Sequence, residues 1–284
     1  MTEIQNLPIG IFDSGVGGLT VYRALHERLP AERFVYLGDT ARVPYGTKSL
    51  ATVERYAIEN SRFLAKRGIK LLVVACNTAS ALALPAIKRA INVEVVGVIE
   101  PGARKAAEAA NRIGVIATEA TIGSQAYSNA IKSFDSTAEV VETACPLFVP
   151  LAEESWANEP ETASIAAKYL TKIKEANVGA LVLGCTHYPI LRDVIQETVG
   201  ASVKLIDSGE AAAETVENLL KNKNLANLTA AQISRQRSLC DDLDHFFVTD
   251  AAERFARVAE RFLGSQPARL EAVELWGNDE LRTN

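Results

Sequence analysis

The chain has 284 residues, and 48% of them are hydrophobic. At roughly 100 to 200 residues per domain, this length predicts two domains or one large one, and the apolar fraction excludes a mainly disordered chain. The 30 Lys and Arg residues against 35 Asp and Glu residues give a net charge of −5, and no stretch gathers five or six basic residues. Nucleic acid is therefore not expected as a primary partner.

The N-terminal segment lacks the pattern of a targeting signal. Its first basic residue, Arg23, comes after the acidic Glu3, and no apolar run in the chain approaches the roughly 18 residues that a membrane-spanning helix needs. We therefore expect a soluble cytoplasmic protein with no membrane partner. The sequence leaves open whether two copies form a homodimer.

Short apolar runs alternate along the chain with stretches of helical spacing. This alternation predicts an α/β fold with mostly parallel strands flanked by helices. The predicted strands are 9–12, 34–37, 71–75, 93–98, 113–117, 138–141, 180–183, 203–206 and 246–249. Two apolar stripes with helical spacing are expected to be core: Val53, Tyr56, Asn60, Phe63 and Leu64, and then Phe255, Val258, Ala259, Phe262 and Leu263.

Two short segments recur about 105 residues apart in the chain. Residues 9–11 (IGI) return as 113–115 (IGV), and residues 73–78 (VVACNT) return as 182–187 (VLGCTH), each time with a cysteine in the same place. Chance similarity between parallel strands is the alternative, but the shared cysteine favours two similar lobes. Turn signals at 100–102 and 207–209 place the first lobe at 1–99 plus 210–284 and the second at 100–209, with a polar linker at 221–238.

The four cysteines, at 76, 145, 185 and 240, lack the spacing of a disulfide framework or a zinc site and are expected to be free thiols. Cys76 and Cys185 each follow a predicted strand and open a predicted helix, whose dipole should lower the thiol pKa below the free value of about 8.5. A single cysteine in this position is usually a buried core residue without a chemical role. Two in equivalent places favour chemistry, whereas Cys145 and Cys240 do not share this context.

Other polar groups follow the predicted strands, where ligands bind in α/β sheets. The glycine-rich turn at 13–18 (DSGVGG) suits an anion but lacks the spacing of a dinucleotide fingerprint. The loop at 38–46 (GDTARVPYG) carries Arg42, the cation nearest to these motifs, although alone it is equally well explained as an ordinary loop. Asp13 and His187 are the ionisable residues beside the cysteines, and His187 alone is equally well explained as a surface or core histidine.

Two thiols on opposite sides of a substrate suit a racemase. One thiolate removes the α-proton while the opposed thiol donates a proton to the other face of the same carbon, and the roles reverse in the other direction. No Lys or Arg lies in the cysteine motifs. Hydroxyls, an amide side chain and helix-start amides would then hold the substrate carboxylates as neutral dipoles.

Several long motifs in fixed order resemble those of the glutamate racemases, in the aspartate/glutamate racemase family. They are 10–21 (GIFDSGVGGLTV), 36–49 (YLGDTARVPYGTKS), 73–80 (VVACNTAS), 97–102 (GVIEPG), 145–154 (CPLFVPLAEE) and 182–191 (VLGCTHYPIL). The similarity runs from about residue 9 to 210 and resumes at 246–264. The polar stretch from 221 to 243 does not align clearly with the family.

The resemblance implies two α/β lobes with the active site in the cleft between them. It implies interconversion of L- and D-glutamate for peptidoglycan synthesis, without pyridoxal phosphate, another cofactor or a metal. By motif match Cys76 would act on the D-enantiomer and Cys185 on the L-enantiomer, with Asp13 and His187 as further catalytic groups. The substrate contacts that it implies are Asp13, Ser14, Tyr45, Gly46, Asn77, Thr78, Thr118, Thr121, Glu153, Thr186 and His187.

Three other interpretations compete with a glutamate racemase. An aspartate or hydantoin racemase would keep the fold and change the substrate. A two-lobed binding or sensor protein would close on a small carboxylate without turnover, but it leaves the paired thiols unexplained. A thiol-disulfide or metal protein is disfavoured because the chain has no Cys-x-x-Cys motif, and residues 185–187 (CTH) supply only half a metal site.

Overall fold

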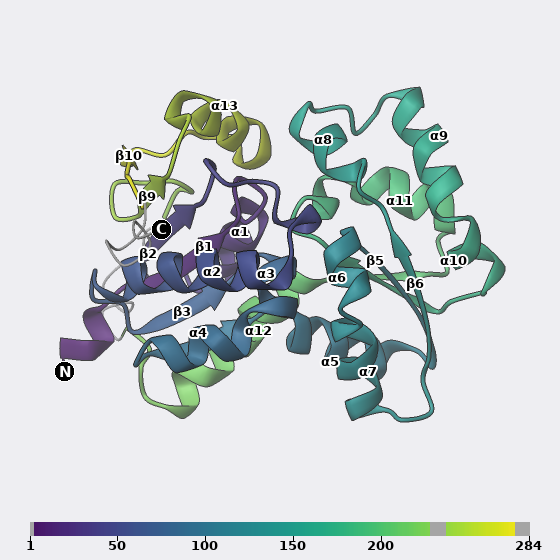
Figure 1. The fold of residues 1–284 in the computed structure, drawn as a ribbon, viewed down its shortest axis with the longest axis horizontal. Coiled ribbons are helices and arrows are strands. Elements are labelled where there is room, and N and C mark those ends of the chain that lie inside the picture. Colours follow the sequence, from purple (N-terminus) through teal and green to yellow (C-terminus); the bar gives the residue numbers. More distant parts are fainter. Residues whose placement is uncertain (1–2, 228–236, 276–284) are drawn as a thin grey trace, which may run out of the picture.

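The computed structural model describes residues 3–227 and 237–275 (Figure 1). The central part of the predicted linker, 228–236, lies outside the described residues. In the described chain every strand pairing is parallel, and the strands form a six-stranded and a four-stranded sheet. We call each sheet with the helices packed on it a lobe.

The first sheet has the order β10-β9-β2-β1-β3-β4 and the second the order β6-β5-β7-β8. The strands of the first sheet are β1 (Ile9–Asp13), β2 (Phe34–Gly38), β3 (Leu71–Val74), β4 (Glu94–Gly97), β9 (His245–Val248) and β10 (Leu270–Ala272). Those of the second are β5 (Arg112–Ala117), β6 (Glu139–Ala144), β7 (Ala180–Gly184) and β8 (Lys204–Asp207).

All nine predicted strands are present, and the predicted fold class is confirmed. The largest boundary difference is in β6, which continues to Ala144 through the polar residues Glu142 and Thr143. As an edge strand, β6 keeps one side unpaired, so it tolerates polar side chains that weaken the strand pattern. β10 has only three residues and was not predicted.

The internal repeat corresponds to a repeated topology. β2-β1-β3-β4 in the first sheet has the same order as β6-β5-β7-β8 in the second. β1 and β5, which carry the repeated Ile-Gly segment, are therefore equivalent strands, and so are β3 and β7, which precede Cys76 and Cys185. The interpretation of two similar lobes is confirmed at the level of strand order.

Helices flank both sheets, and α1, α12 and α5 pack against one another in series between the lobes. The α-helices are α1 (Leu19–Arg28), α2 (Leu50–Ala65), α3 (Asn77–Leu82), α4 (Leu84–Ala90), α5 (Ile99–Ala109), α6 (Glu119–Gly123), α7 (Ala126–Phe134), α8 (Phe148–Glu153), α9 (Pro160–Tyr169), α10 (Thr171–Glu175), α11 (Arg192–Val199), α12 (Ser208–Asn222) and α13 (Ala252–Leu263). Three 3-10 turns complete the elements: η1 (Glu3–Asn6), η2 (Tyr45–Thr47) and η3 (Tyr188–Leu191).

The two predicted apolar stripes lie on α2 and α13. On α13, Phe255, Val258 and Phe262 are at most 3% exposed and join a hydrophobic cluster that runs through both lobes. Figure 1 shows α13 above the first sheet, on the side that faces α8 of the second lobe. No helix in the described residues is long and apolar enough to cross a membrane.

The segment that follows the second lobe is attached to the first sheet. β9 pairs with β2, and Asp244 just before it accepts hydrogen bonds from the Phe34 amide and the Tyr22 hydroxyl, both at 2.8 Å. The Tyr22 oxygen in turn accepts a bond from the Cys240 amide at 2.8 Å. These buried bonds fix residues 240–248 against α1 and β2.

We predict that Tyr22→Phe destabilises the protein. The substitution removes the donor to Asp244 and leaves the Cys240 amide without its acceptor, and a buried polar group without a partner costs about 1–3 kcal/mol. Urea unfolding should show a loss of this size. Tyr169→Phe is the matched control, because the Tyr169 hydroxyl accepts only an exposed 3.3 Å bond from Leu147. Equal stability of Tyr22→Phe and this control would contradict the prediction.

Candidate active site

The carboxyl ends of the two sheets face each other, and the predicted site residues gather where they meet. Asp13 ends β1 and Cys76 follows β3, while Thr118 follows β5 and Cys185 follows β7. Hydrogen bonds cross between the lobes here, from Thr20 Oγ1 to the Thr186 carbonyl at 2.8 Å and between the hydroxyls of Thr78 and Thr118 at 3.0 Å. The site is thus built from both lobes.

Cys76 is the N-cap of α3. Its Sγ accepts a hydrogen bond from the Ala79 amide at 3.4 Å and donates one to Ser14 Oγ at 3.5 Å. The predicted position at a helix start is therefore confirmed. The side chain is nearly closed off from solvent, with 5% of the residue exposed.

The predicted low pKa of Cys76 is wrong for this structure. Burial and, to a lesser extent, the negative charge of Asp13 raise the pKa of the thiol to about 12, although the bonds with Ser14 and the Ala79 amide lower it in part. Desolvation of a buried thiolate outweighs the stabilisation by the helix start. Cys76 is accordingly a thiol at neutral pH.

Asp13 lies beside Cys76 and is fully buried. Burial raises the pKa of its carboxyl group, and the charge of His187 and the backbone amides of Gly18, Gly15 and Ser14 lower it in part. The Gly15 amide donates to Oδ2 at 2.9 Å. A carboxylate with a raised pKa next to a thiol can exchange a proton with it.

The second thiol lies in a different environment. Cys185 Sγ is 3.8 Å from Nδ1 of His187, and Nε2 of the same ring is 3.1 Å from Glu153 Oε1. Cys185 does not cap a helix directly, because the 3-10 turn η3, which contains Pro189, separates it from α11. The thiol, imidazole and carboxylate form a chain of the kind that activates a cysteine nucleophile or base.

Both ring nitrogens of His187 have a polar partner, Cys185 Sγ at Nδ1 and Glu153 Oε1 at Nε2. Burial lowers the pKa of its imidazole, but the hydrogen bonds and the charges of Cys185 and Glu153 raise it more, to about 10. For Glu153, burial raises the pKa, and the bond and charge of His187 with the charge of Arg254 more than offset this, so the pKa is lowered. At neutral pH the pair is an imidazolium and a carboxylate.

Hydroxyls and one amide line the rest of the meeting point. The side-chain oxygens of Thr78, Thr118 and Thr121 lie within 3.0 to 3.2 Å of one another, and Thr118 caps α6. Asn77 at the start of α3 accepts a bond from the Tyr127 hydroxyl at 2.6 Å, and its Nδ2 donates to Ser208 at 3.4 Å. These side chains are neutral donors and acceptors, as the sequence predicts.

Two glycines permit the lobes to approach closely. A Cβ at Gly17 would lie 2.3 Å from Thr186 Oγ1 and 2.5 Å from the His187 ring, and a Cβ at Gly46 would lie 2.7 Å from that of Thr118. Any other residue at 17 would displace the two residues that follow Cys185. Gly46 therefore shapes the site through its missing side chain.

A buried network holds the loop of η2, and the sequence analysis missed its centre, Asp39. This carboxylate accepts hydrogen bonds from Arg42 Nε at 2.8 and 2.9 Å, from Asn60 at 3.0 Å, from Thr249 at 3.0 Å and from the Tyr45 hydroxyl. The guanidinium of Arg42 also pairs with Glu59 of α2, so both of its ionic partners are carboxylates of the first lobe. Arg42 is therefore no free cation for a substrate.

A signal for this network was present in the sequence. Asn60 is a polar residue within the apolar stripe of α2, and the structure shows it fully buried and bonded to Asp39 and Tyr45. Tyr127 and Ser208 bond to the Asn77 side chain, but no sequence pattern indicates this contact because both residues lie far from Asn77 in the chain. Glu153 contacts His187 rather than the hydroxyl cluster, so it reaches Cys185 only through that ring.

All four cysteines are free thiols, as expected, and all are buried. Burial raises the pKa of Cys145 to about 12 and that of Cys240 to about 11. Cys240 lies by Tyr22 and Ser265 of the first lobe. Cys145 lies closer to the site, since the charge of Cys185 influences its pKa.

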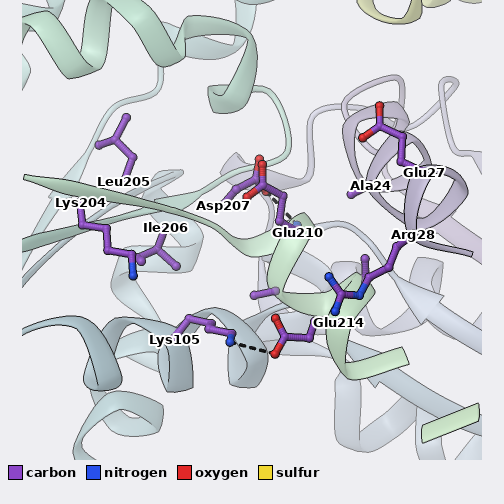
Figure 2. A pocket seen from close by; sticks show the side chains of 12 residues that line it. Ala24, Glu27, Arg28, Lys105, Lys204, Leu205, Ile206, Asp207, Glu210 and Glu214 are labelled. Carbon is purple, nitrogen blue, oxygen red and sulfur yellow. Dashed lines mark hydrogen bonds and ion pairs between the residues drawn. The ribbon is translucent and has the colours of Figure 1, made fainter. Parts of the chain in front are cut away.

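A cavity of about 480 Å³ lies elsewhere in the molecule, and neither Cys76 nor Cys185 lines it (Figure 2). Residues from the C-terminal half of α1, from α5, β8 and α12 line it, and none of the predicted site residues is among them. Its lining contains both acidic and basic side chains, including the pair of Lys105 and Glu214 at 2.9 Å. The cysteine site lies instead at the opposite, N-terminal end of α1.

We predict that His187 titrates well above the ordinary value of 6.5 and that Glu153→Gln lowers its midpoint. The carboxylate favours the imidazolium, so folding is stabilised below about pH 6.5 and this contribution is lost as the pH rises through the folded pKa. NMR of the imidazole resonances measures the midpoint. Burial lowers the pKa of His26 and His245, the other two histidines, which serve as internal controls. A wild-type midpoint for His187 at or below 6.5 would contradict the argument.

Comparison with known proteins agrees with this geometry. Residues 9–216 match the profile of the Asp/Glu/Hydantoin racemase family. A protein of Geobacter metallireducens named glutamate racemase is 52% identical over 96% of this chain and 98% of its own length. A solved structure of glutamate racemase from Francisella tularensis in complex with D-glutamate is 39% identical, with a TM-score of 0.86 over 95% of this chain and 98% of that one. The chain belongs to the glutamate racemases of the Asp/Glu/Hydantoin racemase family.

Proposed function

We propose that this protein interconverts L- and D-glutamate with two cysteines and no cofactor. The observation that carries the proposal is the placement of Cys76 and Cys185 after equivalent strands of two lobes whose strand ends face each other. The identity to glutamate racemases over nearly the whole chain supports glutamate as the substrate.

In the proposed reaction one thiolate removes the α-proton. The Cα–H bond breaks, an S–H bond forms, and the electron pair stays on Cα next to the carboxylate. The opposed thiol then gives its proton to the other face of Cα, so an S–H bond breaks and a new C–H bond forms. From the family resemblance, Cys185 removes the proton of L-glutamate and Cys76 that of D-glutamate.

The two thiols have different partners for managing protons. His187, held by Glu153, lies beside Cys185, and an imidazolium there stabilises the thiolate that attacks L-glutamate. Cys76 is the protonated partner, consistent with a pKa raised to about 12 by burial, and Asp13 beside it is positioned to take that proton in the opposite direction. This protonation state is the one that can remove the α-proton of L-glutamate, and the opposite state acts on D-glutamate.

Neutral groups would hold the substrate carboxylates. The hydroxyls of Thr78, Thr118 and Thr121 lie together at the starts of α3 and α6, and Ser14 lies next to Cys76. Helix-start amides and hydroxyls stabilise an anion without a formal positive charge. A cation beside the α-carboxylate would also pair with the thiolate and make it a weaker base. Neutral donors therefore suit a reaction in which a thiolate is the base.

We further propose the context of the enzyme. D-glutamate would serve peptidoglycan synthesis in the cytoplasm. Residues 1–99 with 210–284 would form the first lobe and 100–209 the second, and β9 of the C-terminal segment supports the first assignment by pairing with β2. Light scattering of the purified protein tests whether two copies form a homodimer.

We predict that Cys76→Ala and Cys185→Ala each lower racemisation at least about a thousandfold, because each removes one of two required proton-transfer groups. Both variants should still bind glutamate by calorimetry. Wild-type turnover in D2O should place deuterium at Cα of the product. Cys240→Ala is the control, because this buried thiol lies in the first lobe against Tyr22, and it should keep its activity. Full activity in either catalytic variant would refute the two-thiol mechanism.

We also predict that glutamate is the preferred substrate. Circular dichroism of each amino acid incubated with the protein directly follows the loss of ellipticity as the substrate racemises. Racemisation of aspartate faster than glutamate would assign the chain to the related specificity. Binding of either without any loss of signal would favour the binding-protein alternative.

A further inference from the structure

The outer face of α13 makes two contacts with the second lobe. Arg254 Nη2 donates to Glu153 Oε2 at 3.0 Å, and Arg261 Nη1 donates to the Glu153 backbone carbonyl at 3.1 Å. These residues are two turns apart on the helix, so both point from the same face. Two arginines of α13, in the first lobe, thus bind both the side chain and the backbone carbonyl of the last residue of α8.

Glu153 connects this contact to the catalytic pair. Its Oε2 pairs with Arg254 while its Oε1 is 3.1 Å from His187 Nε2, so each carboxylate oxygen has its own partner. The His187 ring is also packed edge-to-face on Phe262 of α13, with 6.2 Å between ring centroids. One helix therefore contacts His187 directly and also controls the carboxylate that orients it.

Glu153 and Arg254 differ in their exposure to solvent. The Glu153 side chain is 17% exposed and that of Arg254 is 59% exposed. A largely buried carboxylate has few water partners, so removing Arg254 frees Oε2 and allows the carboxyl group to rotate away from Nε2. The fold loses little, because the apolar face of α13 holds the helix in place.

We propose that Arg254 is a positioning residue for the Cys185 half of the reaction, acting through Glu153 on His187. The inference rests on the proposed function, because it assumes that Cys185 removes the α-proton of L-glutamate. The charge of Arg254 fixes Glu153, Glu153 fixes the imidazole, and the imidazole at 3.8 Å fixes the protonation of the thiol. Cys76, on the other lobe, lies outside this chain of contacts.

The test is Arg254→Ala, assayed with α-deuterated L- and D-glutamate. An exposed ion pair contributes little, so we expect kcat/KM to fall only about three- to tenfold. The equilibrium constant of racemisation is one, so this fall must be equal in both directions. The isotope effect need not be equal: slower proton removal by Cys185 should raise the effect on kcat/KM for L-glutamate and lower that for D-glutamate.

Two further variants make the result decisive. Arg257→Ala removes an exposed arginine from the same helix and should match the wild type, and Arg254→Lys should restore most of the isotope pattern. A fall in kcat/KM with unchanged isotope effects, or no fall at all, would overturn the positioning role. An inactive wild-type protein would instead refute the proposed function, so the two failures are distinguishable.

Discussion

The opposition of two parallel sheets, carboxyl end to carboxyl end, is the constraint on which the rest of the site depends. Both sheets share the order in which the first strand lies between the second and third, and the polar loops follow the central strands of each. Cys76 and Cys185 occupy equivalent places after β3 and β7, so both thiols lie at the edge where the two sheets meet. Two glycines, Gly17 and Gly46, make that approach sterically possible.

Equivalent backbones do not give equivalent thiols. Cys76 caps a helix beside a buried carboxylate, and Cys185 pairs with an imidazole that a second carboxylate holds. Burial, rather than the helix start, decides the protonation of Cys76. The surroundings of the two thiols therefore differ: a carboxylate lies beside Cys76, and an imidazole lies beside Cys185. Symmetry of the fold and asymmetry of charge thus serve the same reaction.

Features that depend on local sequence pattern could be predicted from the sequence, and features that depend on tertiary contacts could not. Strand ends, the paired cysteines and the neutral hydroxyls follow from short motifs, and His187 was suggested by its place after Cys185. The pKa of Cys76 was predicted with the wrong sign, because desolvation depends on neighbours far away in the chain. Asp39 was missed because its partners Asn60 and Thr249 belong to α2 and to the segment after β9. Arg254 lies on the polar face of an amphipathic helix, and its contact with Glu153 depends on how α13 and α8 pack in the folded chain.

The attachment of β9 to β2 has a consequence for the order of folding. The second sheet is formed by residues 112–207 without interruption, whereas the first sheet pairs residues 34–38 with residues 245–248 across the whole of it. Pairings of such long sequence separation are slow, because a large loop must close before any contact is gained. During synthesis the second lobe can therefore fold before β9, β10 and α13 of the first lobe have been made. The contacts of Arg254 and Arg261 with Glu153 would then form as the last event of folding, when α13 docks.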